Sequence, residues 1–141
     1  EGPNYEEAPV RWWHGGLTRL HEPRGQSVAV SDSGVVTGIH WGSWGTAGFV
    51  WHRGEFVTIP VPPPTPSGFT FLQPYGVNDR AQVVGSSSEG AFLWQNGRTT
   101  VLPNLVSMSA AYDINDRGQV VGSSSVQQDG LNQHAVLWIR R

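Results

Sequence analysis

The chain has 141 residues, a formal net charge of −2 and only 14% charged residues. This length favours a single core, and the weak charge argues against a basic surface for nucleic acid or anionic lipid. No apolar stretch reaches the roughly 18–20 residues of a membrane-spanning helix, so membrane insertion is not expected. Cysteine is absent, which excludes disulfides and thiolate metal sites.

The amino end, residues 1–7, is rich in glycine, proline and acidic residues and is expected to be flexible. A chain that begins at Glu1 is what remains after removal of an export signal, although a trimmed chain would begin in the same way. Residues 8–141 are expected to form a single β-repeat domain.

A repeat of about forty residues organises this domain. Tryptophans at positions 12, 51, 94 and 138 each end an apolar stretch, and the first three are followed by x-x-Gly. A second motif, Asn/Ser-Asp-x-Gly/Ala-x-Val-x-Gly, recurs at 31–38, 78–85 and 115–122. The fixed order of both motifs predicts three units, at about 8–46, 47–90 and 91–133, and a terminal strand at 134–141.

Turn chemistry predicts four antiparallel strands in each unit. In the third unit these strands are expected at 91–94, 98–102, 111–114 and 119–123. The Asn96-Gly97 pair between apolar runs is typical of a two-residue hairpin, because both positions must adopt positive φ. No amphipathic helical period is present, so the predicted fold class is all-β.

The turn in the second motif is expected to be a type I turn whose aspartate caps nearby backbone N–H groups. Glycine occupies its fourth position at Gly34 and Gly118, but the second unit has Ala81 there. The middle turn therefore either carries left-handed strain of order 1 kcal/mol or shifts its geometry.

The first strand of each unit is apolar on both faces. In the second unit, Phe49 and Trp51 alternate with Val50, so this strand is expected to lie between two layers. The tryptophans that recur at this position are expected in the core. Arg11 stands in the place of Val50 in the first unit, so that face is expected to meet water or a partner.

The sequence words at 91–97, 114–122 and 134–138 resemble the HAF family of bacterial extracellular repeats, and the resemblance covers residues 8–138. It implies an exported protein whose units are like blades of a β-propeller, and it lends no catalytic residues. Propellers need at least about four blades, so three units leave two alternatives. Either oligomerisation completes the ring, for example with two chains, or the units form a threefold β-trefoil.

Residues found in only one unit are the candidates for function, because the repeat does not require them. A glycine-rich segment of the first unit holds two tryptophans and a histidine, whose rings suit stacking on a sugar or packing on a protein. Covering an open end of the core is the alternative for this loop, and a turn hydrogen bond is the alternative for Asp113. The candidate ligand-binding residues are His40, Trp41, Trp44, Trp13 and Asp113.

A partner interface is expected at the open strand edges and at a proline-rich insertion of the second unit. Such insertions are stiff and extended, so this one is interpreted as a projecting arm or an edge cover. The candidate interface residues are Arg11, Pro63, Pro64, Phe69 and Trp138.

The five histidines are scattered and show no metal-ligand spacing, so neither catalysis nor a metal or cofactor is expected. The repeated Asp32, Asp79 and Asp116 are interpreted as turn residues rather than as a calcium or carboxylate site. The sequence therefore favours a secreted, non-catalytic module that recognises carbohydrate. The alternative is a structural subunit of a secreted complex, either a homo-oligomer or a hetero-complex, whose open edges another chain completes.

Overall fold

The computed structural model describes residues 8–20, 24–42, 45–64, 66, 68, 70–129 and 131–140, and this part of the chain is all-β without a helix. No segment of it forms a helix long and apolar enough to cross a membrane. The strands of these residues are β1 (Val10–Trp13), β2 (Gly16–Arg19), β3 (Gly25–Val30), β4 (Val36–Gly42), β5 (Gly45–His52), β6 (Glu55–Ile59), β7 (Leu72–Val77), β8 (Val83–Ser87), β9 (Gly90–Gln95), β10 (Arg98–Val101), β11 (Ser109–Ile114), β12 (Val120–Ser125) and β13 (Gln133–Trp138).

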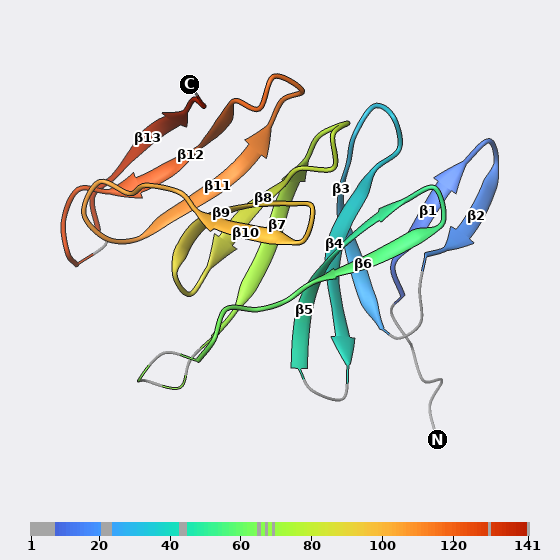
Figure 1. The fold of residues 1–141 in the computed structure, drawn as a ribbon, viewed down its shortest axis with the longest axis horizontal. Coiled ribbons are helices and arrows are strands. Elements are labelled where there is room, and N and C mark those ends of the chain that lie inside the picture. Colours follow the sequence, from blue (N-terminus) through green and yellow to red (C-terminus); the bar gives the residue numbers. More distant parts are fainter. Residues whose placement is uncertain are drawn as a thin grey trace.

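The strands form four antiparallel sheets that follow one another along the chain (Figure 1). The N-terminal hairpin contains β1 and β2, sheet 1 contains β3 to β6, sheet 2 contains β7 to β10, and sheet 3 contains β11 to β13. None of these sheets closes into a barrel. The four strands predicted for the third unit are confirmed as β9 to β12.

The sheets are out of phase with the sequence repeat. Sheet 1 joins the last two strands of the first unit to the first two of the second, and sheet 2 does the same one unit later. The connections from β6 to β7 and from β10 to β11 carry the chain to the next sheet. Short turns join neighbouring strands within each sheet, except that residues 126–132 connect β12 to β13. Short turns favour pairing of neighbours.

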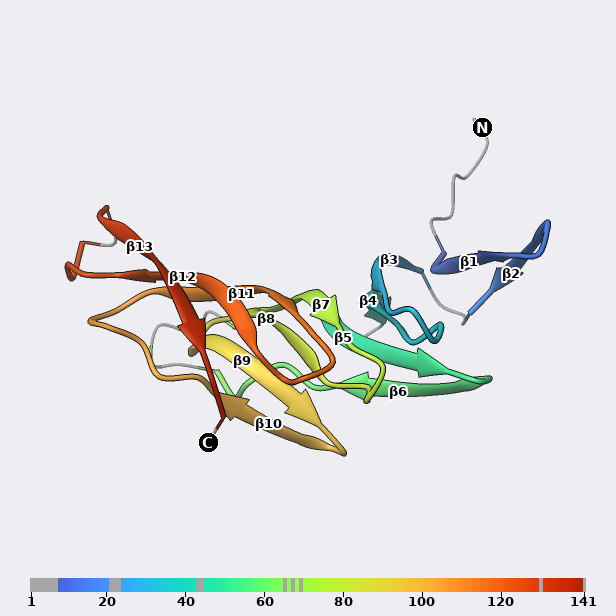
Figure 2. The same cartoon turned by 90° about the horizontal axis from the view of Figure 1, so that it is seen from above.

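The first strands of the sheets lie side by side. Strand β7 contacts both β3 and β11, and the later strands β6 and β10 lie at the opposite edges of their sheets (Figure 2). We call β3, β7 and β11 the inner strands.

Three apolar layers separate the sheets, and the strands that begin the second and third units, β5 and β9, each contribute to two of them. In β5, Phe49 and Trp51 pack with Leu20 in the layer beside the N-terminal hairpin. Val50, on the opposite face, packs with Phe92 and Trp94 in the layer between sheets 1 and 2. The prediction that these strands lie between two layers is confirmed.

Trp12 departs from the core position that the repeat predicts for it. Its side chain is 69% exposed, whereas Trp51 and Trp94 are 7% and 4% exposed. The reason is that β1 pairs only with β2 among the described strands, so no sheet covers its Trp12 face.

The opposite face of β1 is partly covered, since Arg11 is half-buried while Trp13, on the same face, is 52% exposed. The Arg11 guanidinium lies 4.7 Å from the ring centre of Trp51, in sheet 1, and 5.3 Å from that of Trp13. A planar cation stacks favourably on an indole face, which lets arginine replace valine at this position.

The turns follow their predicted chemistry. Asn96 and Gly97 have φ values of 50° and 80°, as the two-residue hairpin requires. Ala81 has a φ of 56° beside 88° at Gly34 and 79° at Gly118, so the middle turn keeps the geometry of the others and carries the strain.

Replacing Ala81 by glycine is therefore expected to raise the free energy of unfolding by about 1 kcal/mol, because glycine adopts positive φ without strain. The matched control is Gly34→Ala, which should lower it by a similar amount. A Cβ at position 34 would lie 3.8 Å from its nearest neighbour, Arg11 Nη1, so this control adds backbone strain without a clash. Denaturant unfolding of both variants measures the effect, and a change of the same sign in both would contradict it.

Candidate functional site

The repeated turns are closed by their asparagines rather than by their aspartates. Asn78 Oδ1 accepts hydrogen bonds from the backbone N–H groups of Arg80 and Gln82, at 3.1 and 3.0 Å. Asn115 makes the same pair of bonds in the third unit. The preceding asparagine thus satisfies the donors of its own turn, and the aspartates cap backbone N–H groups of a neighbouring turn instead.

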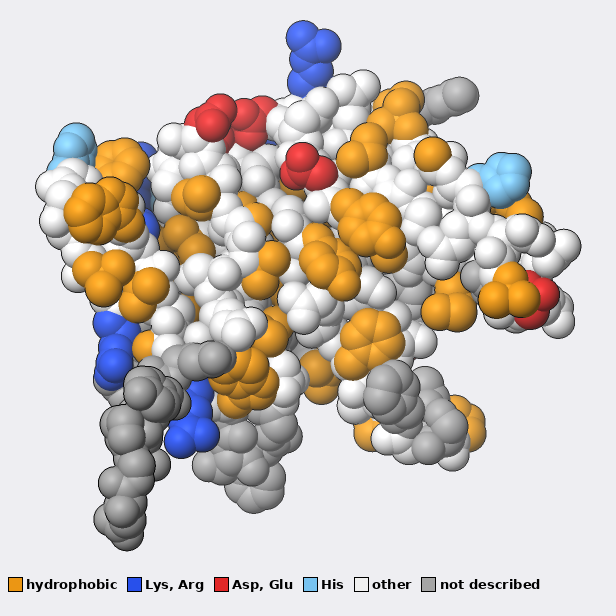
Figure 3. All heavy atoms as spheres, turned by 180° about the vertical axis from the view of Figure 1, so that it is seen from behind, with side chains coloured by type: hydrophobic (Ala, Val, Ile, Leu, Met, Phe, Trp, Pro, Cys, Tyr) orange, Lys and Arg blue, Asp and Glu red, His pale blue; other side chains and the backbone are white. Residues whose placement is uncertain are grey.

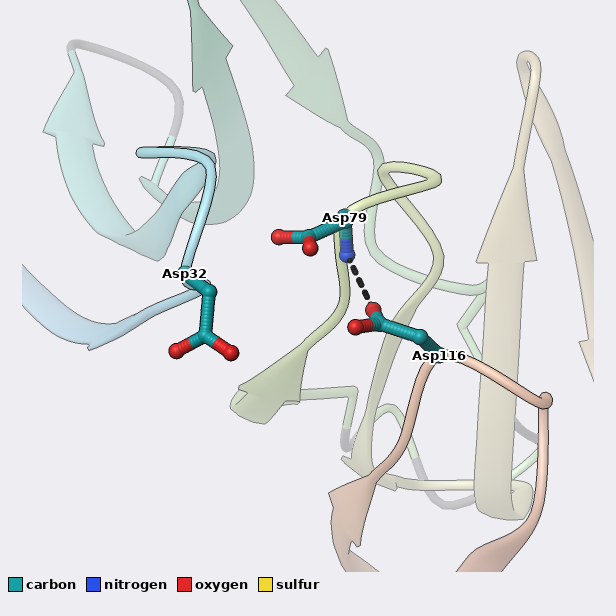
Figure 4. A group of neighbouring side chains, drawn as sticks. All are labelled: Asp32, Asp79 and Asp116. Carbon is teal, nitrogen blue, oxygen red and sulfur yellow. Dashed lines mark hydrogen bonds between the residues drawn. The ribbon is translucent and has the colours of Figure 1, made fainter.

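The aspartates instead join the turn of one unit to that of the next. Asp79 Oδ1 accepts a 2.8 Å hydrogen bond from the backbone N–H of Ser33, and Asp116 Oδ1 accepts one of 2.8 Å from the N–H of Asp79 (Figure 4). Asn78 Nδ2 adds a 3.0 Å bond to the carbonyl of Asn115. We call this series of contacts the turn ladder. It points in one direction, with each aspartate reaching back to the preceding unit.

The turn ladder also gathers three carboxylates. One oxygen of each of Asp32, Asp79 and Asp116 lies within 4.8 Å of the others, a convergence that spacing in the sequence did not reveal. The period of the repeat was the available signal, since equivalent turns of stacked units lie side by side. Two of the carboxylates already accept backbone hydrogen bonds, so their position is explained by the joining of units.

The backbone N–H of Ser33 is the main group that lowers the pKa of Asp79 below its ordinary value of 3.8, with the hydroxyls of Ser31 and Ser33 adding to it. These donors favour the charged carboxylate, so its stabilising contribution is present above about pH 4 and is lost as the pH falls through the lowered pKa.

For Asp79→Asn, the deficit in unfolding free energy relative to the natural chain is therefore expected to be largest above pH 4 and to shrink in more acidic solution. Denaturant unfolding between neutral pH and pH 3 measures this difference. A deficit that stays constant over the whole range would contradict the assignment.

An aromatic groove of about 390 Å³ lies between β1 and β3. Trp12 and Trp13 line one side, and Val28 and Val30 line the other. Trp13 is 52% exposed and Val30 is 64% exposed. In Figure 3, which shows the molecule from behind, hydrophobic side chains stand beside arginines at the end that carries the N-terminal hairpin.

His40 and Trp41 lie near the far end of β4, away from the aromatic groove. The His40 ring meets Phe56 edge to face, with ring centres 5.4 Å apart, and its Nε2 lies 3.4 Å from Thr58 Oγ1. Trp41 is half-buried, and its backbone N–H donates to the carbonyl of Arg24 at 2.7 Å. Trp44 lies outside the described residues. His40 and Trp41 are consecutive in β4, so their side chains point to opposite faces of the sheet, and Trp13 lies elsewhere.

Asp113 is exposed, next to a bulge in β11. Its Oδ1 accepts a 2.9 Å hydrogen bond from the backbone N–H of Ile114, the next residue of the same strand, rather than from a neighbouring turn. Beside it, Tyr112 and Tyr75 lie on adjacent inner strands with ring centres 5.6 Å apart, and both are exposed. Sequence reasoning missed this pair. Bulges in β7 and β11 turn both rings outward, and no sequence motif marks these bulges.

The candidate interface residues are divided between exposed and packed positions. Pro63 and Pro64 are exposed, while Pro62 before them is buried and accepts a 2.7 Å hydrogen bond from Thr70 Oγ1. Trp138 is half-buried, and its Nε1 donates to the carbonyl of Pro103 at 2.7 Å. Phe69 lies outside the described residues. The base of the proline-rich insertion is thus packed rather than projecting.

Comparison with known proteins does not place the chain in a family, since no family model, no curated protein and no solved structure matches it.

Proposed function

We propose that this chain is a non-catalytic, secreted module of the β-propeller type whose first unit is completed by another protein chain. Support for blades comes from successive sheets of consecutive strands whose inner strands lie side by side. A β-trefoil is less well supported, because it needs a closed barrel. Export is supported by the resemblance to HAF repeats.

One observation carries the assembly role. Trp12 occupies a position that is buried in the second and third units, yet it is 69% exposed. Val30 repeats the pattern, since it is 64% exposed and its counterparts Val77 and Ile114 are each 6% exposed. Both side chains line the aromatic groove. A contiguous apolar surface built from core positions is typical of a protein–protein contact.

The test is Trp12→Ser, measured on protein dilute enough for light scattering to show a single chain. Because this side chain is largely exposed, the substitution should change the free energy of unfolding by less than about 0.5 kcal/mol. It should also reduce the fluorescence of a hydrophobic dye, anilinonaphthalene sulfonate, added to the folded protein. Leu131→Ser, at an exposed leucine that does not line the aromatic groove, is the control and should leave dye binding unchanged. A loss of several kcal/mol would show that Trp12 belongs to the chain's own core and would overturn the proposal.

Carbohydrate recognition is the second candidate, favoured by the two exposed indoles beside Arg11 in a groove whose volume lies within the range of small-ligand sites. A glycan array and sugar titrations followed by tryptophan fluorescence test it. Trp13→Ala should abolish a response at the aromatic groove, and Trp41→Ala one at the β4 end. Silence across a broad array would reject this candidate.

A further inference from the structure

We propose that the partner is a second copy of this chain. Strands β11 and β12 of one copy enter the aromatic groove of the other copy. There, β1 of the second copy takes the place of β13 along the edge of β12 of the first. This inference rests on the proposed assembly function and goes beyond it by naming the partner, its orientation and the strand that is exchanged.

The strand pairing of the repeat identifies the edge that β1 lacks. The equivalent strands β5, β9 and β13 pair with β4, β8 and β12, and each places its tryptophan opposite a valine. The pairs are Trp51 with Val36, Trp94 with Val83, and Trp138 with Val120. Strand β1 carries Trp12 at this position, so a strand of the β12 type is its matching neighbour, with Trp12 opposite Val120.

The exposed apolar positions at the two ends of the structure are complementary. Inside the chain, Ile114 of sheet 3 is covered by a layer that contains Val84 of sheet 2. Val30 is the counterpart of Ile114 and is 64% exposed, and Val121 is the counterpart of Val84 and is 48% exposed. Placing β11 and β12 of a second copy in the aromatic groove covers Val30 with Val121, as Val84 covers Ile114.

The turn ladder supports the same orientation. Asp79 and Asp116 each accept a backbone N–H from the preceding unit, but Asp32 has no hydrogen-bond partner among the described residues. Within the same residues, the backbone N–H of Asp116 donates to no group, although that of its counterpart Asp79 does. In the proposed contact, the carboxylate of Asp32 in one copy lies beside the turn of the other copy that holds Asp116.

Replacement of β13 by β1 of the other copy is favoured because β2, which pairs with β1, joins the sheet as well. Four of the six residues of β13 are exposed, whereas four of the six residues of its counterpart β9 are buried. Among the described residues, sheet 3 has three strands, and it has four when β1 and β2 replace β13. Two copies that exchange in both directions form six four-stranded sheets, a number within the range of closed propellers.

The experiment locks β13 in place. Val121 and Leu137 lie directly opposite each other in β12 and β13, both are exposed, and the natural chain has no cysteine. In concentrated solution, light scattering should give the natural chain twice its mass of 15.4 kDa. The variant Val121→Cys/Leu137→Cys should have half that dimeric mass when oxidised, because the disulfide holds β13 on β12. Reduction should restore the dimer.

A second measurement reads the contact directly. The proposed register places Arg11 of one copy opposite Val121 of the other, so a mixture of Arg11→Cys and Val121→Cys chains should form a disulfide-linked dimer containing one of each. Each variant alone should form little. A natural chain that stays monomeric in concentrated solution, a locked variant that dimerises when oxidised, or equal linking in the unmixed samples would overturn the inference. These outcomes leave the result expected for Trp12→Ser unchanged, so failure of this inference is separable from failure of the proposed function.

Discussion

Gly85→Ala is expected to lower the free energy of unfolding by about 3 kcal/mol, at the upper end of the usual cost of overpacking. Gly85 lies on β8 beside a bulge in β7, and a Cβ added there would collide with the carbonyl oxygen of Gln73 and lie 2.8 Å from Pro74 Cα. Both are backbone atoms, so no side-chain rotation can relieve the overlap. Denaturant unfolding measures the loss.

The control is Gly16→Ala, on the exposed strand β2, where a new Cβ would have only an ordinary 3.5 Å contact with the carbonyl oxygen of Trp13. This variant should stay within about 0.5 kcal/mol of the natural chain. Equal effects at the two positions would contradict the steric explanation. The same overlap exists at Gly38 and Gly122, which meet the carbonyls of Gln26 and Ala110 beside equivalent bulges, so the repeated glycine has one steric cause.

Trp94→Ala is expected to lower the free energy of unfolding by about 4 kcal/mol, as is usual for a large aromatic residue removed from a core. Trp94 is 4% exposed and packs in the layer between sheets 1 and 2. Its indole Nε1 is buried without a hydrogen-bond partner, so the loss is one of packing. Trp94→Phe should therefore cost much less, about 1 kcal/mol, because it keeps most of the ring and removes the unpaired donor.

Trp12→Ala is the matched comparison, since it makes the same substitution at the same position of the repeat. It should cost less than about 1 kcal/mol, because the side chain is already 69% exposed. Unfolding curves of dilute protein give both values, and light scattering should show a single chain under those conditions. Similar losses at Trp12 and Trp94 would show that the chain itself covers this face of β1 and would contradict the exposure of Trp12.

Much of the fold was predictable from local pattern. The strands of the third unit and the hairpin at Asn96 follow from turn chemistry, which depends on neighbouring residues alone. Turn chemistry also marked Ala81 as the exceptional position, and the structure decided for strain rather than a shifted turn. The burial of both faces of β5 follows from its sequence, because apolar side chains occupy consecutive positions and therefore both faces of the strand. The grouping of strands into sheets was not predictable in this way. The sequence pattern fits equally well whether a sheet begins with the first or with the third strand of a unit.

The candidate site was less predictable. Spacing gave no sign that Asp32, Asp79 and Asp116 converge, or that Tyr75 lies beside Tyr112, because both arise from the stacking of separate units. The repeat also predicted a core role for Trp12, and the structure leaves it exposed, since burial depends on which strands are neighbours.

The sequence by itself determined an all-β chain of repeated units, the turns between its strands and the residues that can serve as core. These features have a local physical basis: positive φ at glycine and asparagine, and the alternation of side chains along a strand. Only the tertiary structure decided which of those core positions are covered. Trp51, Trp94 and Trp12 share one sequence context, but a neighbouring sheet lies against the first two and not against the third.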